Sequence, residues 1–257
     1  MIWGIEKDGR RRIAASMAGV LLLTGVLVSL FHTERFQTVS KGEELPIYSV
    51  DCGDRRIAIT FDAAAGASDT DALLGILAAH KVKATFFLCG CWMRNHPEET
   101  IRLYGAGHEI GNHGDKHKDP VRLGSAELEK EIEDASAELQ RLVGIRPVLY
   151  RPAYGSYNKQ VITTARQLGY EAVQWSVDSL DWKEQGVEAM TQQVLQHAEL
   201  QGGAILLFHN DARYTAQALD QLLTELENRG YCMVTVSELL LPKPYQIDHR
   251  GRQFPLS

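Results

Sequence analysis

The sequence predicts an α/β protein with a mostly parallel β-sheet, preceded by one N-terminal transmembrane helix. Two patterns predict this fold class. Between residues 55 and 240, short apolar segments alternate with longer amphipathic ones, and parallel strands need helical crossovers of this kind. Residues 13–31 carry no charge and follow a basic cluster at Lys7 and residues 10–12. The length of 257 residues and the apolar content of 44% suit one core of roughly 200 residues plus a short addition.

The N-terminal segment is predicted to be an uncleaved membrane anchor. At about 1.5 Å per residue, the apolar run 13–31 just spans the hydrocarbon core of a bilayer, and its basic flank is expected to stay in the cytoplasm. A cleaved signal peptide is the alternative, but it needs small residues spaced as in A-x-A, which Ser29-Leu30-Phe31-His32 does not offer. We therefore expect a single-pass protein of the cell membrane with its folded domain outside the cell.

The rest of the chain divides into three parts. Residues 32–54 are expected to form a stalk or linker, residues 55–240 the folded domain, and residues 241–257 a polar extended tail. Removing the four basic and two acidic residues of the segment 1–31 leaves 23 basic and 31 acidic residues, a net charge near −8. A strongly acidic domain without a basic stripe argues against nucleic acid as a partner.

Hydrophobic periodicity predicts seven strands separated by helices. Right-handed crossovers then give a parallel sheet, and periodicity leaves open whether it closes into an irregular barrel or stays open and doubly wound. The expected strands are 56–61, 83–89, 108–112, 148–151, 172–177, 204–209 and 231–236. The expected helices are 71–80, 98–104, 126–142, 159–168, 188–199 and 215–229.

Polar residues stand at the ends of several of these strands. Because the carboxyl ends of parallel strands form one rim, which carries the active site in parallel α/β barrels, these side chains are expected to converge. Arg151 is able to clamp the carboxylate of Asp62, and the carboxylates of Asp178 and Asp181 are able to keep the imidazole of His209 protonated. The residues at strand ends are Asp62, His113, Arg151, Asp181 and His209.

Two histidines are candidates for metal binding, and four cysteines raise the question of disulfide formation. His113 and His117 are four residues apart, so both imidazoles could reach one divalent cation, although this spacing alone is a weak signal. The cysteines are expected to be buried free thiols. Cys89 and Cys91 are alternate residues of a strand, where the geometry disfavours a disulfide. A bond between two more distant cysteines stays open outside the cell. The four are Cys52, Cys89, Cys91 and Cys232.

Six short motifs lie in a fixed order along residues 55–240. They are Thr60-Phe61-Asp62, Lys83-Ala84-Thr85-Phe86-Phe87, Gly107-His108-Glu109-Ile110-Gly111-Asn112-His113 with His117, Arg151-Pro152-Ala153-Tyr154-Gly155, Asp181-Trp182 and Leu207-Phe208-His209. Together they resemble the NodB-like polysaccharide deacetylases, carbohydrate esterase family four. The resemblance implies a distorted (β/α)₇ barrel of the NodB-homology type and a cell-wall glycan as substrate.

The resemblance also implies a role for each site residue. The family activates a metal-bound water with an aspartate base that an arginine orients. A histidine acid, whose pKa an aspartate sets, protonates the leaving amine. The residues that match these roles are, for catalysis, Asp62, Arg151, His209 and Asp181; for metal binding, His113 and His117; and for substrate binding, the Tyr154 N–H at the oxyanion and Trp182 and Leu207 at the acetyl group.

The first motif departs from the family pattern at position 63. Family members normally read Thr-Phe-Asp-Asp-Gly, in which the second Asp completes the metal site, and this chain has Ala63. Asp69, Asp115 and Asp62 itself are the candidates for the missing ligand, although Asp69 also fits the capped start of the next helix. The altered motif resembles a sporulation-type branch of the family. The expected cofactor is Zn²⁺, with Co²⁺, Mn²⁺ or Ni²⁺ as alternatives.

Two functions follow from these patterns. The first is metal-dependent de-N-acetylation of peptidoglycan or a chitin-like polymer of GlcNAc or MurNAc, with release of acetate. The second is a membrane-tethered glycan-binding relative with little or no activity, which acts in envelope or spore-wall assembly, and Ala63 argues for it directly. A glycosidase with two carboxylates is disfavoured, because such chemistry does not require two histidines and an arginine.

Overall fold

The computed structural model describes residues 44–256, all of which belong to the second of two compact units, residues 39–257. The predicted membrane anchor at residues 13–31 lies outside the described residues. From residue 44 to residue 256, no helix is both long enough and apolar enough to span a bilayer.

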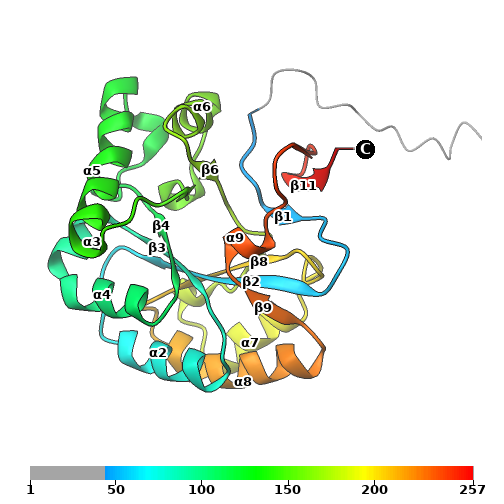
Figure 1. Cartoon of the computed structure of the whole chain (residues 1–257). Helices are drawn as coiled ribbons and strands as arrows, with labels where there is room; N and C mark the ends of the chain where they lie inside the picture. The colour runs from blue at the N-terminus through cyan, green and yellow to red at the C-terminus, as the bar shows by residue number, and fades with distance from the viewer. Residues whose placement is uncertain (1–43, 257) are drawn as a thin grey trace, which may run out of the picture. The chain divides into compact units, whose positions relative to one another are not determined.

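A sheet of parallel strands forms the centre of the domain (Figure 1). Its spatial order is β6-β5-β4-β3-β2-β8-β7, and β9 pairs with the start of β2. The expected strand at 172–177 is two short strands at opposite ends of this order. The arrangement is consistent with the distorted (β/α)₇ barrel, with an open seam between β6 and β7. The strands are β2 (Arg56–Ala63), β3 (Thr85–Leu88), β4 (Glu109–Asn112), β5 (Leu149–Tyr150), β6 (Glu171–Ala172), β7 (Val177–Asp178), β8 (Ile205–His209) and β9 (Cys232–Val234).

The six expected helices are all present, and their ends carry ordinary start and stop signals. The side chain of Asn158 caps the backbone N–H of Val161 at the start of α6, and Gly144, with φ of 77°, ends α5. Two short helices, α3 and α9, were not expected, because they are too short to show a helical period. The helices are α2 (Thr70–Ala79), α3 (Gly90–Asn95), α4 (Pro97–Gly105), α5 (Ser125–Val143), α6 (Lys159–Gln167), α7 (Val187–Leu195), α8 (Thr215–Asn228) and α9 (Val236–Leu239).

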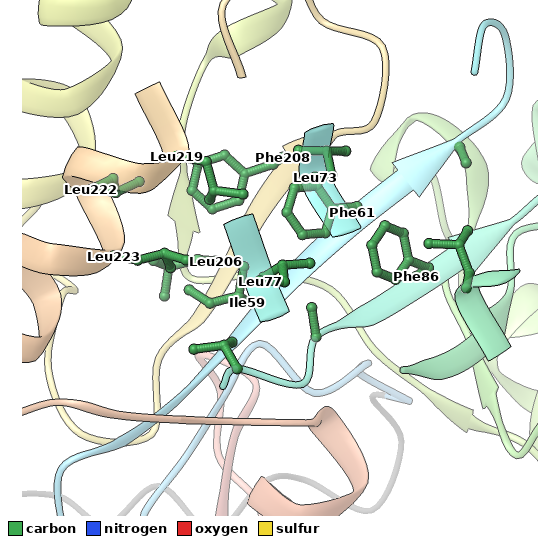
Figure 2. Packing of buried hydrophobic residues seen from close by; sticks show 14 of the residues in the cluster. Ile59, Phe61, Leu73, Leu77, Phe86, Leu206, Phe208, Leu219, Leu222 and Leu223 are labelled. Carbon is green, nitrogen blue, oxygen red and sulfur yellow. The ribbon is translucent and has the colours of Figure 1, made fainter. Parts of the chain in front are cut away.

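The main core lies between β2, β3 and β8 and the helices α2 and α8 (Figure 2). Phe61 is in register with Phe86 on one side and Phe208 on the other, and its ring stacks on Phe86 with centroids 4.8 Å apart. Burying each such ring contributes roughly 1.5–3 kcal/mol. Leucines of α2 and α8 cover the same strands, so the strand ends are held on a rigid support. These leucines are Leu73, Leu77, Leu219, Leu222 and Leu223.

A second, small sheet joins the two ends of the described chain. It consists of β1 (Ser49–Val50), β11 (Arg252–Pro255) and β10 (Tyr245–Ile247), in that order. The expectation of a polar extended tail at 241–257 is therefore wrong for residues 245–255. Gln253 is fully buried and accepts a hydrogen bond from the backbone N–H of Leu241 at 2.8 Å. Strands of two to four residues carry too little alternation to be predicted, and their pairing depends on residues distant in the sequence.

The expected stalk at 32–54 also contains folded residues. Ile47 forms a parallel bridge with Val173, which follows β6, and its side chain is 1% exposed. The backbone N–H of Ile47 donates to the carbonyl of Ala172 at 2.8 Å, and the N–H of Gln174 donates to the carbonyl of Ile47 at 2.7 Å. This segment therefore lies along the seam at which the main sheet is open.

Candidate active site

A cavity of about 480 Å³ opens at the carboxyl ends of the parallel strands. Seven of the residues predicted from the sequence line it. Arg151 and Asp181 are buried, and each contacts one of these lining residues. The predicted convergence of the strand-end residues is therefore observed. The predicted lining residues are Asp62, His113, His117, Tyr154, Trp182, Leu207 and His209.

Asp62, at the end of β2, is held by a buried arginine. A guanidinium nitrogen of Arg151 donates to Asp62 Oδ1 at 2.7 Å and to Thr60 Oγ1 at 2.9 Å, and the other donates to the carbonyl of Gln174 at 3.0 Å. Burial opposes ionisation of Asp62, but the positive charge of Arg151 and the nearby imidazoles of His113 and His209 outweigh it and lower the pKa of the carboxyl. The carboxylate is therefore ionised at neutral pH.

His209, at the end of β8, forms an ion pair with Asp181. Its Nδ1 lies 2.7 Å from Asp181 Oδ1, while its backbone N–H and the hydroxyl of Thr215 both donate to Asp181 Oδ2 at 2.7 Å. Burial alone would lower the pKa of His209, but the hydrogen bond and charge of Asp181 raise it above the ordinary value. The imidazole is therefore poised to carry a proton opposite an ionised carboxylate.

His113 and His117 have the opposite electrostatics. His113 Nδ1 lies 2.8 Å from the carbonyl of Arg151, and since a carbonyl only accepts, Nδ1 carries the proton and the lone pair is on Nε2. That Nε2 is 3.5 Å from Asp62 Oδ2. Burial lowers the pKa of both histidines, for His117 to about 4 with a contribution from His113. Both imidazoles are therefore neutral at pH 7, the form that binds metals.

A cysteine lies beside this histidine pair. The Sγ of Cys89 and one ring nitrogen from each of His113 and His117 all lie within 4.8 Å of one another. Cys89 follows β3 directly and is fully buried. The sequence interpretation missed it, because the thiol was assigned to the core as part of an apolar strand. Cys89 is the last residue of the expected strand 83–89, and the rule that residues at the carboxyl ends of parallel strands converge would have included it.

Aromatic side chains form the exposed part of the wall. Tyr154 is 68% exposed and Trp182 is 57% exposed, and the ring of Tyr154 lies 4.4 Å from the ring of His117. Tyr154, His117 and Leu180 have φ values of 61°, 52° and 54°, in the left-handed region that side chains rarely adopt. Such strained backbone conformations concentrate at functional sites. Leu207, in contrast, is 2% exposed and forms an apolar floor.

Three further aspartates do not join the cluster of Asp62, His113 and His117. Asp69 occupies the N-cap position of α2, makes no capping hydrogen bond there, and belongs neither to the cavity wall nor to the clustered ligand atoms. Asp115 is 3% exposed and accepts a hydrogen bond from Arg94 at 2.7 Å. It is therefore engaged by Arg94 and does not belong to the ligand atoms clustered around His113 and His117. Asp178 lines the cavity, but its carboxylate accepts from the backbone N–H of Leu180.

The four cysteines are free, the state that the sequence favoured while it left a disulfide between distant cysteines open. Their burial was predicted less well. Cys89 is buried, Cys52 and Cys91 are half-buried, and Cys232 is exposed at the start of β9.

Comparison with known proteins places this fold and site in one family. The polysaccharide deacetylase family matches residues 49–173. A peptidoglycan-N-acetylglucosamine deacetylase of Bacillus cereus is 37% identical over 198 residues, which cover 75% of this chain and 92% of that protein. The chain belongs to the polysaccharide deacetylase family. Another similar protein is the uncharacterized YlxY of Bacillus subtilis, which is 32% identical over 195 residues. The match covers 76% of the present chain but only 60% of YlxY.

Solved structures of the family include both active and inactive proteins. Wild-type BA3943, a CE4 family pseudoenzyme from Bacillus anthracis, is 28% identical with a TM-score of 0.73, over 77% of this chain and 69% of that one. A mutant of BA3943 with restored enzymatic activity is 29% identical, also with a TM-score of 0.73, over 77% of this chain and 72% of that one. The wild-type pseudoenzyme and the mutant with restored activity are therefore both similar in fold to this chain.

Proposed function

We propose that this chain is a metal-dependent deacetylase that removes acetyl groups from N-acetylated cell-wall polysaccharide, such as peptidoglycan or a chitin-like polymer of GlcNAc or MurNAc. One observation supports this most directly: the ionised carboxylate of Asp62 and the proton-carrying imidazole of His209 line the same cavity. Two groups whose pKa values are shifted in opposite directions suit general base and general acid roles. The named activity of the Bacillus cereus relative supports the same assignment.

The residues around His113 and His117 fit a divalent ion. Both imidazoles are neutral, and the hydrogen bond to the Arg151 carbonyl orients the lone pair of His113, as supporting groups do in metal sites. These two histidines would hold the ion, for which Zn²⁺ is the first candidate and Co²⁺, Mn²⁺ and Ni²⁺ are alternatives. When bound, such an ion makes water more acidic and polarises a carbonyl oxygen.

Asp62 would act as the base on the attacking water. Arg151 holds Oδ1 and leaves Oδ2 on the side of His113, so the carboxylate has one oxygen oriented and one available for a proton. The water oxygen then bonds to the acetyl carbon, and the negative charge develops on the former carbonyl oxygen. The backbone N–H of Tyr154 would donate to that oxygen, a contribution of about 3–4 kcal/mol for one such donor.

His209 would act as the acid on the leaving group. Its Nδ1 is engaged by Asp181, so the proton available to the substrate is on Nε2. As the C–N bond breaks, the sugar nitrogen takes this proton and leaves as an amine, and the acetyl group leaves as acetate. Leu207 and Trp182 would contact the acetyl methyl and the sugar ring, since both line the cavity.

The proposed location is the outer face of the cell membrane. The charge-free run 13–31 and its basic flank favour a single anchor with the folded domain outside, where the cell-wall glycan lies. The altered first motif at Ala63 favours a role in sporulation. No nucleic acid partner is proposed for the acidic domain.

Acetate release tests the proposal. The full-length protein, supplied with Zn²⁺ or Co²⁺, should release acetate from N-acetylated chito-oligosaccharide or from peptidoglycan. Asp62→Asn should reduce the rate by about 10²–10⁴-fold, the usual contribution of a general base, with metal content and circular dichroism unchanged. A metal-loaded wild-type protein that releases no acetate from any wall glycan would refute the proposal. Loss of metal from Asp62→Asn equal to that from His113→Ala would make Asp62 a ligand instead.

A second candidate function is that of a catalytically weak, membrane-tethered glycan-binding protein of the envelope or spore wall. Ala63 supports it, because the family's usual carboxylate ligand is missing at that position. The inactivity of wild-type BA3943, a protein with the same fold, also supports it. Wall-glycan binding without acetate release or bound metal would favour this second function.

A further inference from the structure

We infer that the thiolate of Cys89 is the third protein ligand of the metal, in place of the carboxylate that Ala63 cannot provide. The inference rests on the proposed function, since it names a ligand of the same metal site. Catalytic zinc sites usually have three protein ligands and one open position. His113 and His117 supply two, and the remaining question is which nearby group supplies the third.

The backbone places Cys89 directly beside position 63. The N–H of Cys89 donates to the carbonyl of Ala63 at 3.0 Å, at the point where β2 and β3 end next to each other. A side chain from Cys89 therefore starts from the same corner of the rim as a side chain from position 63. The chain therefore lacks the family's carboxylate ligand at Ala63, at the end of β2, and has a sulfur at Cys89, directly after the neighbouring strand β3.

The distances fit a tetrahedral site after a small adjustment. Bond lengths of about 2.3 Å to sulfur and 2.1 Å to nitrogen put these ligand atoms about 3.6 Å apart in a tetrahedron. In the structure, Cys89 Sγ and the two imidazole nitrogens lie within 4.8 Å of one another. Each separation needs to close by about 1 Å at most, which side-chain rotation supplies. Asp69 has no place in this group.

The surroundings of Cys89 favour a thiolate bound to a cation. Its side chain is fully buried, and Sγ lies 3.4 Å from the carbonyl of His113, to which the metal-free thiol donates. An anion in this position would be costly unless a cation neutralised it. Metal binding would therefore release a proton from sulfur.

A thiolate ligand also changes which metal the site prefers. Thiolates favour Zn²⁺ and other softer ions, whereas Mg²⁺ and Mn²⁺ prefer oxygen ligands. A site of one sulfur and two imidazoles should therefore select Zn²⁺ or Co²⁺ and discriminate against Mn²⁺ more strongly than a site of one carboxylate and two imidazoles.

Cobalt spectroscopy tests the assignment without relying on activity. The full-length protein with Co²⁺ should show a sulfur-to-cobalt charge-transfer band in the near ultraviolet, and Cys89→Ser should lose it. The Zn²⁺ affinity of Cys89→Ser should fall by more than about 100-fold, because even groups that only support ligands typically contribute 10–100-fold. Cys232→Ser is the control: Cys232 is exposed at the start of β9 and is outside the ligand cluster, so its replacement should change neither property.

A second variant separates ligand loss from misfolding. Ala63→Asp combined with Cys89→Ser should recover Zn²⁺ affinity without recovering the charge-transfer band, because a carboxylate then takes the position of sulfur. Circular dichroism in the presence of a chelator checks that each variant is folded. A wild-type cobalt protein without a thiolate band, or a folded Cys89→Ser that keeps wild-type Zn²⁺ affinity, overturns the inference.

The outcomes for the ligand and for the enzyme are distinguishable. A Cys89-dependent cobalt band in a protein that releases no acetate supports the ligand and refutes the deacetylase proposal. Acetate release by a metal-loaded protein without any thiolate band supports the deacetylase and refutes the ligand.

Discussion

Replacing Arg151 by Met should destabilise the protein far more than breaking an ion pair of the same length at the surface. Arg151 and Asp62 are 2.7 Å apart with side chains 0% and 7% exposed. Lys130 and Asp134, on the outer face of α5, are 2.8 Å apart with side chains 72% and 40% exposed. The two pairs have similar lengths but differ in burial and in the number of hydrogen bonds that the cation makes, and both differences favour the larger loss at Arg151.

The expected magnitudes follow from the partners that each change leaves behind. Arg151→Met removes three hydrogen bonds and leaves the carboxylate of Asp62 buried without its cation. Breaking a buried pair in this way lowers the free energy of unfolding by about 3–5 kcal/mol. Lys130→Met leaves Asp134 in water, and pairs of this i, i+4 type contribute about 0.3–0.5 kcal/mol. The methionine at 151 still packs against the Phe87 ring, over which the guanidinium lies at 4.0 Å.

Urea unfolding of the full-length protein, with a chelator present so that metal binding does not contribute, measures both losses. Adding Asp62→Asn to Arg151→Met should recover part of the stability, because it removes the stranded charge. Equal losses for Arg151→Met and Lys130→Met, or no recovery in the double variant, would refute the idea that the Asp62 carboxylate depends on the buried guanidinium.

Two further predictions concern the acid and the aromatic wall. Asp181→Asn removes the charge that raises the pKa of His209. Because acetate release should fall at high pH as His209 loses its proton, that fall should move to lower pH in the variant. A pH profile of the rate checks this, and an unchanged high-pH limb would exclude His209 as the acid. Trp182→Ala should raise the KM for chito-oligosaccharide by about tenfold and change kcat little, because a stacking contact typically contributes about 1 kcal/mol or more. Steady-state kinetics measures both constants, and an unchanged KM would place Trp182 outside the glycan site.

Sequence reasoning located most of the site because one topological rule governs it. Asp62, His113 and His209 end parallel strands, so their convergence follows from the strand order without knowledge of any distance. Cys89 ends its expected strand and obeys the same rule, but its apolar neighbourhood favoured the interpretation as a core residue. The motif resemblance named Asp181 rather than Asp178 as the partner of His209, and the structure places Asp181 against the imidazole.

The parts that the sequence did not predict depend on contacts between distant residues. The break between β6 and β7 separates residues that read as one apolar strand. The pairing of β11 with β1 joins segments about two hundred residues apart, for which a local pattern carries no information. The expected boundaries at residues 54 and 240 therefore cut through a folded unit.

The bridge between Ile47 and Val173 attaches the start of the described chain to the main sheet. The next residue, Gln174, donates its N–H to Ile47 and accepts at its carbonyl from Arg151, whose other nitrogen binds Asp62. Three successive contacts thus connect the start of the described chain to the carboxylate of Asp62. The backbone hydrogen bonds of Ile47 cover part of the open edge of the main sheet, so replacing the residues around Ile47 with a flexible linker should loosen the support of the Asp62 carboxylate.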